Sequence, residues 1–280
     1  MRGSGLPKTQ LYISGGVDMY KHHQVSIENL LFYFQDDKNI LAVILAGSIA
    51  KGLERADSDI DAIVVTTDER YMELSKSNKL SECIYGHCTY EGGYFDIKYC
   101  TKGYLAAVAQ QGSEPSRNAF IAAKCLYCDD DEIAEIVPQI GVFQTSEKPE
   151  KMLSFYSAFS LNHGYFWSVS ENNTYLRVRT AADIVLFGYR LLLQNNEILF
   201  PCHKGLSQTV MSMENKPDRI VEKERRLLTQ LSNDAKNDFV DSILNFIDYV
   251  PPQDYPVILT RFIDDNELWW YKGRPVITEW

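Results

Sequence analysis

Two short runs of apolar, largely β-branched residues constrain the fold of this chain most severely. They span residues 40–46 and 60–67, and the second contains four apolar residues in succession at 62–65. Runs of this length and composition are typical of strands buried on both faces. The segment between them, residues 48–59, is polar and contains a glycine. We therefore expect two buried strands joined by a polar connection.

The rest of the first half alternates helical and strand patterns. Glu91–Gly93 carries a glycine-containing turn signal between two strands expected within residues 83–101. The other predicted elements are helices near 22–34, 69–77 and 104–110, an apolar segment at 120–127, and a helix that begins near Asp131. This succession predicts an α+β domain built on a small mixed sheet.

Helical periodicity dominates the chain after the composition shifts at residues 146–149. Apolar positions recur at three-and-four spacing in four stretches, namely 151–170, 175–193, 219–231 and 235–249. We predict an α-helical bundle for this half, with domains at residues 1–148 and 149–280. The aromatic run Trp269–Tyr271 is expected to pack on the bundle core, with a place in a substrate pocket as the alternative.

Charge and hydropathy exclude several classes of protein. The chain of 280 residues has 28 basic and 38 acidic residues, a net charge of −10. A nucleic-acid partner is therefore disfavoured, because no basic stripe is present to neutralise phosphates. The longest plainly apolar stretch is far too short to cross a bilayer, and the N-terminus lacks a signal-peptide pattern, so we expect a cytoplasmic protein without membrane contact. Met1–Gly5 looks like an added leader and is left out of the fold prediction.

The cysteines and a histidine pair carry weaker signals. Six cysteines in a long chain without a secretory signal predict reduced thiols. Cys125 and Cys128 form a Cys-x-x-Cys pair, for which a zinc site is the alternative to buried free thiols. His22 and His23, at the start of a predicted helix, are expected to face solvent.

The connection between the two apolar runs carries the chemistry. Asp59 and Asp61 lie at positions i and i+2 where a strand begins, so their carboxylates project from the same face. Two adjacent carboxylates repel each other, and a bound cation would offset this repulsion. Hard oxygen ligands together with substrate phosphates suit magnesium. At the other end of the connection, Gly47 lets backbone amides approach a phosphate, and the Ser48 hydroxyl can bond to it.

A third acid fits the same site. Asp96 lies among apolar and aromatic neighbours on the strand 94–100, where an acid is costly without a positive partner. If this strand pairs beside the one that begins at Asp59, Asp96 completes a metal-binding triad and can act as metal ligand, general base, or both. The alternative is a surface acid paired with Lys98, two positions along the same face.

These residues resemble the DNA polymerase beta nucleotidyltransferase superfamily. The resemblance rests on Gly47–Ser48, Gly52, the run Ser58–Asp61 and the isolated strand acid Asp96. Within the superfamily the chain is similar to small bacterial members with a C-terminal helical bundle, including aminoglycoside and lincosamide antibiotic nucleotidyltransferases. The resemblance implies two magnesium ions held by the three acids, with Ser48 on the triphosphate of ATP or another nucleoside triphosphate. It also places Lys51 and Ser58 near phosphate.

One segment of the helical half resembles these proteins too. Residues 194–205 follow a predicted helix and end in a lysine-bearing turn similar to one in the bundle of some family members. We expect Lys204 to bind the nucleotide phosphates. The alternative is that the lysine only interacts with a helix C-terminal dipole.

The function implied by the resemblance is a transfer of nucleoside monophosphate. An acceptor hydroxyl of a small molecule, such as an aminoglycoside or lincosamide antibiotic, attacks the α-phosphorus of ATP and pyrophosphate leaves. An enzyme of this kind confers antibiotic resistance. The alternatives are a protein-adenylylating enzyme such as a toxin of a toxin–antitoxin pair, a non-catalytic nucleotide-binding regulator and, third, a polymerase or tRNA-modifying role. The acceptor, the modified hydroxyl, the nucleotide preference and the oligomeric state are not predicted.

Overall fold

The computed structural model describes residues 19–280, and its contacts divide the chain into two units. The first unit contains the chain up to Gly112 together with Ser116–Val142. The second contains Ser113–Pro115 and Phe143–Trp280. The second unit therefore also includes a short piece from within the first half of the chain. The leader Met1–Gly5 lies outside the described residues.

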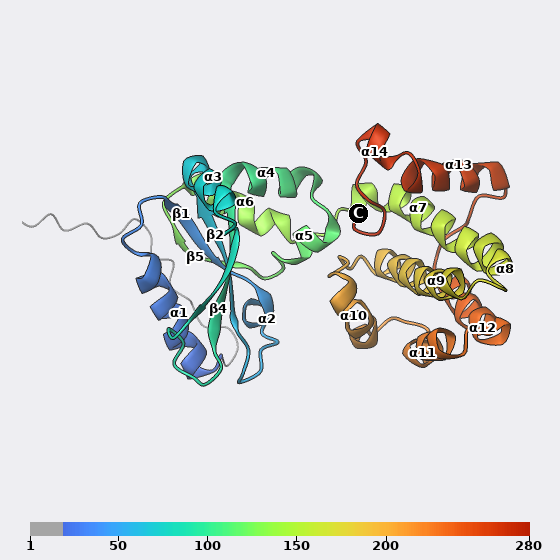
Figure 1. Ribbon diagram of the computed structural model, residues 1–280, viewed down its shortest axis with the longest axis horizontal. Helices are drawn as coiled ribbons and strands as arrows, with labels where there is room; N and C mark the ends of the chain where they lie inside the picture. The colour runs from blue at the N-terminus through green and yellow to red at the C-terminus, as the bar shows by residue number, and fades with distance from the viewer. Residues whose placement is uncertain (1–18) are drawn as a thin grey trace, which may run out of the picture. The chain divides into compact units, whose positions relative to one another are not determined.

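The first unit is built on a five-stranded mixed sheet (Figure 1). The strand order is β3-β4-β2-β1-β5, with β2 and β4 parallel and the other neighbours antiparallel. The strands are β1 (Ile40–Leu45), β2 (Ile60–Thr66), β3 (Ser81–Tyr85), β4 (Tyr94–Thr101) and β5 (Lys124–Cys128). The two apolar runs of the sequence are the central strands β1 and β2, as predicted.

Helices cover both faces of this sheet, which explains why its central strands are apolar throughout. On one face, α1 (Lys21–Phe34) packs against alternate strand residues such as Val43 and Val64. On the other face, α4 (Lys102–Gln111) and α6 (Asp131–Ile140) pack against the intervening residues, such as Ile44 and Val65. The shorter helices are α2 (Gly47–Lys51), α3 (Asp68–Lys76) and α5 (Glu114–Asn118). Successive strand side chains point to opposite faces, so each central strand contributes to two cores.

The hairpin differs from its predicted form. β3 ends at Tyr85 and β4 begins at Tyr94, so residues 86–93 connect the two strands instead of a tight turn at Glu91–Gly93. Gly86 and Gly92 both have a left-handed backbone, with φ of +83° and +76°. Two left-handed glycines within one connection reverse the chain over a longer segment than one turn requires.

The second unit is entirely helical in the residues that the structure describes, as predicted. Its longer helices are α7 (Lys148–Leu161), α9 (Thr174–Asn195), α11 (Ile220–Gln230), α12 (Asn233–Leu244) and α13 (Tyr255–Asn266). Its shorter elements are η1 (Thr145–Glu147), the π-helical turn η2 (Asn162–Phe166), α8 (Trp167–Val169), η3 (His203–Gly205), α10 (Leu206–Ser212) and α14 (Trp269–Lys272). The core of the bundle gathers around α9, whose residues from Ile184 to Leu193 are all buried. None of the helices described is long and apolar enough to span a bilayer.

A buried ionic group, the Glu114 cluster, consists of Glu114, Lys151, Arg190 and Gln194. The Glu114 carboxylate accepts hydrogen bonds from Lys151 Nζ at 3.0 Å, Arg190 Nη2 at 3.4 Å and Gln194 Nε2 at 2.5 Å. It also accepts one from the backbone N–H of Phe200 at 2.9 Å. All four side chains of the cluster are buried. A buried carboxylate needs donors of this number and charge to offset its loss of hydration.

The aromatic run Trp269–Tyr271 does not pack on the core, so that expectation is wrong. The three residues are 37%, 68% and 76% exposed. They form a single turn of α14, in which successive side chains point about 100° apart, so one turn cannot direct all three toward the same core.

Candidate active site

Three aspartates meet at one edge of the sheet. Asp61 on β2 lies directly opposite Asp96 on the parallel neighbour β4, and Asp59 lies just before β2 on the same face. One carboxylate oxygen from each of Asp59, Asp61 and Asp96 lies within 4.8 Å of the other two. The expectation for Asp96 depended on β4 pairing beside β2. The structure has this pairing, and it brings Asp96 to Asp59 and Asp61.

The alternative for Asp96, a surface ion pair with Lys98, is not found. Among the residues that the structure describes, neither Asp59 nor Asp96 forms an ion pair with a lysine or arginine. Asp59 and Asp96 therefore bring two carboxylates to this edge that no described lysine or arginine pairs with. Oxygen ligands of this kind and spacing suit a hard divalent cation, so the residues present fit Mg²⁺.

Gly47 is the residue that makes room for Asp61. A Cβ added at Gly47 would lie 1.8 Å from Asp61 Oδ2, far inside van der Waals contact. The backbone at this position also has φ of +66°, which favours glycine. The backbone N–H of Ala46 donates to the carbonyl of Asp61 at 3.0 Å, which fixes the turn after β1 against the start of β2. Gly47 thus shapes the acid site through close approach to a carboxylate.

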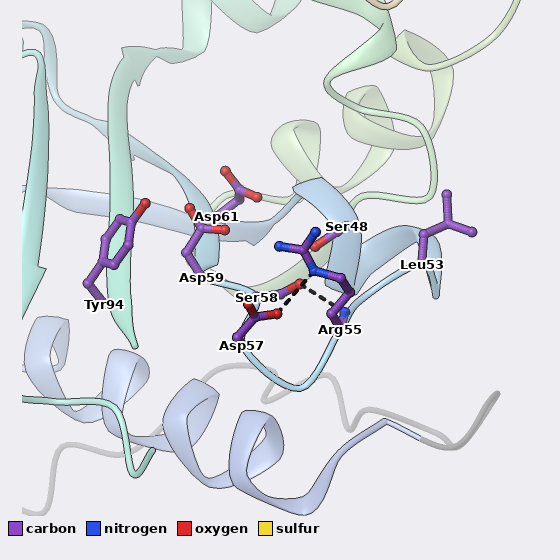
Figure 2. A pocket seen from close by; sticks show the side chains of 8 residues that line it. All are labelled: Ser48, Leu53, Arg55, Asp57, Ser58, Asp59, Asp61 and Tyr94. Carbon is purple, nitrogen blue, oxygen red and sulfur yellow. Dashed lines mark hydrogen bonds and ion pairs between the residues drawn. The ribbon is translucent and has the colours of Figure 1, made fainter. Parts of the chain in front are cut away.

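An open pocket of about 440 Å³ lies in front of the acids (Figure 2). It is lined by Ser48, Leu53, Arg55, Asp57, Ser58, Asp59, Asp61 and Tyr94. Ser48 lies on α2 directly after β1, and Ser58 Oγ accepts a hydrogen bond from the backbone N–H of Arg55 at 2.9 Å. The predicted serines and two of the acids therefore border one cavity.

Four of the lining residues were not predicted as site residues. Arg55 Nε lies 3.0 Å from Asp57 Oδ1, and both side chains are largely exposed. Figure 2 shows the Arg55 guanidinium turned into the pocket beside Ser48, with Leu53 at the far side. The sequence signal for this residue is a cation inside the motif segment, which suits contact with phosphate.

Tyr94 is the fourth missed residue. It lies two positions before Asp96 on the same strand face, and its hydroxyl points toward Asp59 in Figure 2. The hydrogen bond to Asp59 and the charge of that carboxylate raise the pKa of Tyr94 to about 12. The hydroxyl therefore stays protonated at neutral pH and acts as a donor at the edge of the acid group. The i, i+2 spacing from Asp96 was the available sequence signal.

Residues from α1 and from the hairpin connection hold the segment that leads into Asp59. His22 Nε2 lies 2.9 Å from the carbonyl oxygen of Ala56, and the Tyr90 hydroxyl donates to the carbonyl of Ser58 at 2.5 Å. The rings of His22 and Tyr90 lie 4.6 Å apart, and that of His23 lies 5.0 Å from Tyr90. His23 is fully buried, so the expectation that it faces solvent is wrong. It is buried because the histidine start of α1 packs beside this segment.

Two predicted lysines lie outside the pocket's lining. Lys51 Nζ donates to Asn118 Oδ1 at 3.0 Å and borders a separate small cavity of about 80 Å³. Lys204 belongs to the second unit, in η3 directly before α10. Because it precedes a helix and lies well beyond the end of α9, interaction with a helix C-terminal dipole does not explain it.

The cysteines are free thiols, as predicted. The aspartate group is the one cluster of metal-binding side chains in residues 19–280, so the zinc alternative at Cys125 and Cys128 has no support there. Burial raises the pKa of Cys125 to about 12, which keeps this thiol protonated and unreactive.

The fold and the site define the class of protein. A mixed sheet carries three clustered aspartates beside a glycine-serine turn, as expected of a nucleotidyltransferase domain. Residues 28–132 match the family described as "Polymerase beta, Nucleotidyltransferase". This part of the chain therefore belongs to the polymerase beta nucleotidyltransferase superfamily. No curated protein matches the sequence.

Two solved structures are similar to the chain at low identity. One is a nucleotidyltransferase-like protein from Exiguobacterium sibiricum, with 9% identity, 86% of this chain and 75% of that chain covered, and a TM-score of 0.40. The other is the spectinomycin adenyltransferase AAD(9) from Enterococcus faecialis, solved with ATP and spectinomycin. It has 13% identity, 87% and 96% coverage, and a TM-score of 0.31. Both TM-scores are too low to define a substrate for this chain.

Proposed function

We propose that the chain transfers AMP from ATP, with Mg²⁺, to a hydroxyl group of a small molecule such as an aminoglycoside or lincosamide antibiotic. The observation that carries the proposal is the grouping of Asp59, Asp61 and Asp96 within 4.8 Å of one another, inside the part of the chain that matches the nucleotidyltransferase family. The acceptor class is supported by the sequence resemblance, which includes an all-helical second half.

The aspartates are the residues that would hold magnesium, two ions in all. Mg²⁺ binds through one or two carboxylates together with substrate phosphates, and the open pocket in front of the acids leaves space for a triphosphate. When bound, the metal supplies charge neutralisation for the attacking and leaving oxygens of an in-line displacement. The close approach of Gly47 to Asp61 Oδ2 keeps that carboxylate at the edge of the sheet, where a metal can reach it.

The chain's own residues have separate tasks in the reaction. Ser48 donates its hydroxyl to the triphosphate, and Asp96 takes the proton of the attacking hydroxyl as general base. A bond forms between the acceptor oxygen and the α-phosphorus. The bond from the α-phosphorus to the bridging oxygen of the β-phosphate breaks, and pyrophosphate leaves. Asp59 and Asp61, through the metal they would hold, would keep the nucleotide in line with the acceptor.

Four further residues are proposed for nucleotide binding, namely Gly47, Lys51, Ser58 and Lys204. Lys204 can be tested by itself, because its substitution removes one positive charge from an exposed turn. Lys204→Ala should weaken binding of a non-hydrolysable ATP analogue, measured by calorimetry with Mg²⁺. Lys38→Ala, an exposed lysine of the first unit, is the matched control. Equal affinities for the two variants would remove Lys204 from the site.

The proposed function is tested by incubating the protein with ATP, Mg²⁺ and a panel of aminoglycosides, aminocyclitols and lincosamides. Mass spectrometry should detect one panel member with an added AMP, and removal of the metal with EDTA should abolish the product. The Asp59→Asn, Asp61→Asn double variant should lose the activity while remaining folded. Turnover that survives in this variant would reject the site. Label on a partner protein without any small-molecule product would instead support a protein-adenylylating enzyme.

A further inference from the structure

Two tyrosines at the end of the β3–β4 hairpin, one exposed and one half-buried, form an aromatic pair beside the acids. Tyr85, the last residue of β3, lies directly opposite Tyr94, the first residue of β4, and their ring centroids are 5.3 Å apart. Tyr85 is 68% exposed although it is a large aromatic side chain at the end of an edge strand. Tyr94 lines the acid pocket. One ring thus borders the pocket and the other extends the aromatic surface away from it.

Strand register places this pair on the same face as the carboxylates. Cys83 of β3 lies opposite Asp96, and Asp96 lies opposite Asp61. Residues directly opposite in neighbouring strands, and residues two apart in one strand, share a face of the sheet. Cys83, Tyr85, Tyr94 and the acids therefore form one continuous surface at this edge.

The order of strands gives the surface a direction. β1, which leads into Ser48, lies on one side of β2, whereas β4 and then β3 lie on the other. In the proposed function, on which this inference rests, Ser48 binds the triphosphate that departs as pyrophosphate. An in-line displacement places the attacking and leaving oxygens on opposite sides of the phosphorus. The attacking hydroxyl must then approach from the side of β4 and β3.

We infer that Tyr85 and Tyr94 form the acceptor subsite, where they stack on a ring of a hydroxylated, amine-bearing acceptor. An aromatic face attracts a cationic amine and the C–H face of a saturated ring. The neighbouring acids attract the same positive charge, and Asp96 lies between the tyrosines and the nucleotide side, next to the hydroxyl to be deprotonated. Tyr85 selects the acceptor, and it does so without contact with the nucleotide.

The test compares Tyr85→Ala with Tyr85→Phe, which keeps the ring, and with Phe32→Ala, which removes an exposed aromatic ring from α1. Spectinomycin, an aminocyclitol with fused rings and methylamino groups, is the probe. Its affinity is measured by calorimetry with Mg²⁺ and a non-hydrolysable ATP analogue present. Tyr85→Ala should weaken spectinomycin binding by about tenfold, whereas Tyr85→Phe and Phe32→Ala should bind like the wild type. The affinity for the nucleotide analogue should be the same in all four proteins.

A second measurement uses the exposed thiol of Cys83. Spectinomycin should slow its alkylation by iodoacetamide, read by peptide mass spectrometry, but leave the rate at Cys202 unchanged. The inference is overturned if the wild type does not bind spectinomycin, if Tyr85→Ala binds it as Phe32→Ala does, or if Cys83 is not protected. If the wild type does not bind the Mg²⁺-nucleotide or does not transfer AMP, the proposed function is contradicted. The subsite is then tested by spectinomycin binding alone.

Discussion

Carboxylates occur in two opposite settings in this molecule, one in each unit. Glu114 is buried in the helical unit and accepts four hydrogen bonds, two of them from the cations Lys151 and Arg190. Asp59, Asp61 and Asp96 lie at an open edge of the sheet, and three negative charges are gathered within 4.8 Å. The first setting satisfies a charge within the protein. The second concentrates three carboxylates at an accessible edge.

The difference separates a stabilising carboxylate from a functional one. The donors around a buried charge offset its loss of hydration, and removal of one partner leaves the others unpaired at high cost. Like charges held together at an accessible edge oppose folding, so they are explained by a ligand that arrives later. Substitutions among the three aspartates should therefore change AMP transfer, whereas substitutions in the Glu114 cluster should change the free energy of unfolding.

The largest expected effect is on catalysis, from Asp96→Asn. This change keeps the shape of the side chain but removes the proposed general base, so the proposed AMP transfer should fall by about 10²- to 10⁴-fold. The midpoint temperature of thermal unfolding, followed by circular dichroism, should be unchanged or slightly raised, because one of three repelling charges is gone. A destabilised protein with retained activity would place Asp96 in the same category as Glu114.

Glu114→Gln should show the opposite pattern. It removes the charge that faces both Lys151 and Arg190, so that Lys151 keeps only the Glu147 carboxylate and Arg190 only carbonyl partners, which should lower the free energy of unfolding by about 3–5 kcal/mol. All four tryptophans lie in the second unit, at positions 167, 269, 270 and 280, so urea unfolding followed by their fluorescence reports on this unit. The control Glu132→Gln removes a largely exposed carboxylate and should change stability by no more than about 0.5 kcal/mol. Equal effects of the two variants would contradict the role of the Glu114 cluster.

Gly47→Ala tests whether the position of the acids, as well as their presence, matters. The new methyl group would collide with Asp61 Oδ2 in a left-handed backbone, so we expect about a 100-fold loss of transfer and a loss of stability of about 1–2 kcal/mol. Gly273→Ala is the matched control, with φ of +63° and no atom within 4 Å of its added Cβ. It should cost about 1 kcal/mol of stability and leave the activity intact. If both variants transfer AMP equally well, the close approach of Gly47 to Asp61 is not required.

The smallest expected effect is a pH dependence in the helical unit. Burial, together with the charge of Lys236, lowers the pKa of His163 from 6.5 to about 4. Between these values the unfolded chain binds more protons than the folded one, so stability falls as the pH drops from about 6.5 to about 4. His163→Gln should reduce this pH-dependent loss by about 1–3 kcal/mol in tryptophan-monitored unfolding. The control is His203→Gln, at an exposed histidine, and His163→Gln should change the dependence of stability on pH by more than this control does.

The local patterns that identified the site were strong for physical reasons. Strands β1 and β2 were predicted because residues buried on both faces must be apolar throughout, and the helices of the second unit because their apolar faces repeat at helical spacing. The pair Asp59 and Asp61 shares a face by the geometry of any strand. In contrast, the sequence could not place Asp96 opposite Asp61, because the parallel pairing of β2 and β4 joins segments that are distant in the chain.

The two wrong expectations, for His23 and for Trp269–Tyr271, also concern contacts between elements that are distant in the chain. Whether His23 is buried depends on how α1 packs beside the segment before Asp59, and whether Trp269–Tyr271 is exposed depends on what covers one short helix. Tyr85 and Tyr94 become a pair only through the register of the hairpin. Each of these properties belongs to contacts between elements, about which composition and spacing within an element say little.

The sequence by itself determined the chemistry available to this protein, namely the glycine-serine turn, the Asp-x-Asp pair and one further acid on a strand. It also determined that the first half is a sheet with helices and the second half is helical. Only the tertiary structure decided which carboxylates act together and which are neutralised. The reason is that electrostatic interaction depends on distance and burial, and both are set when segments far apart in the chain come into contact.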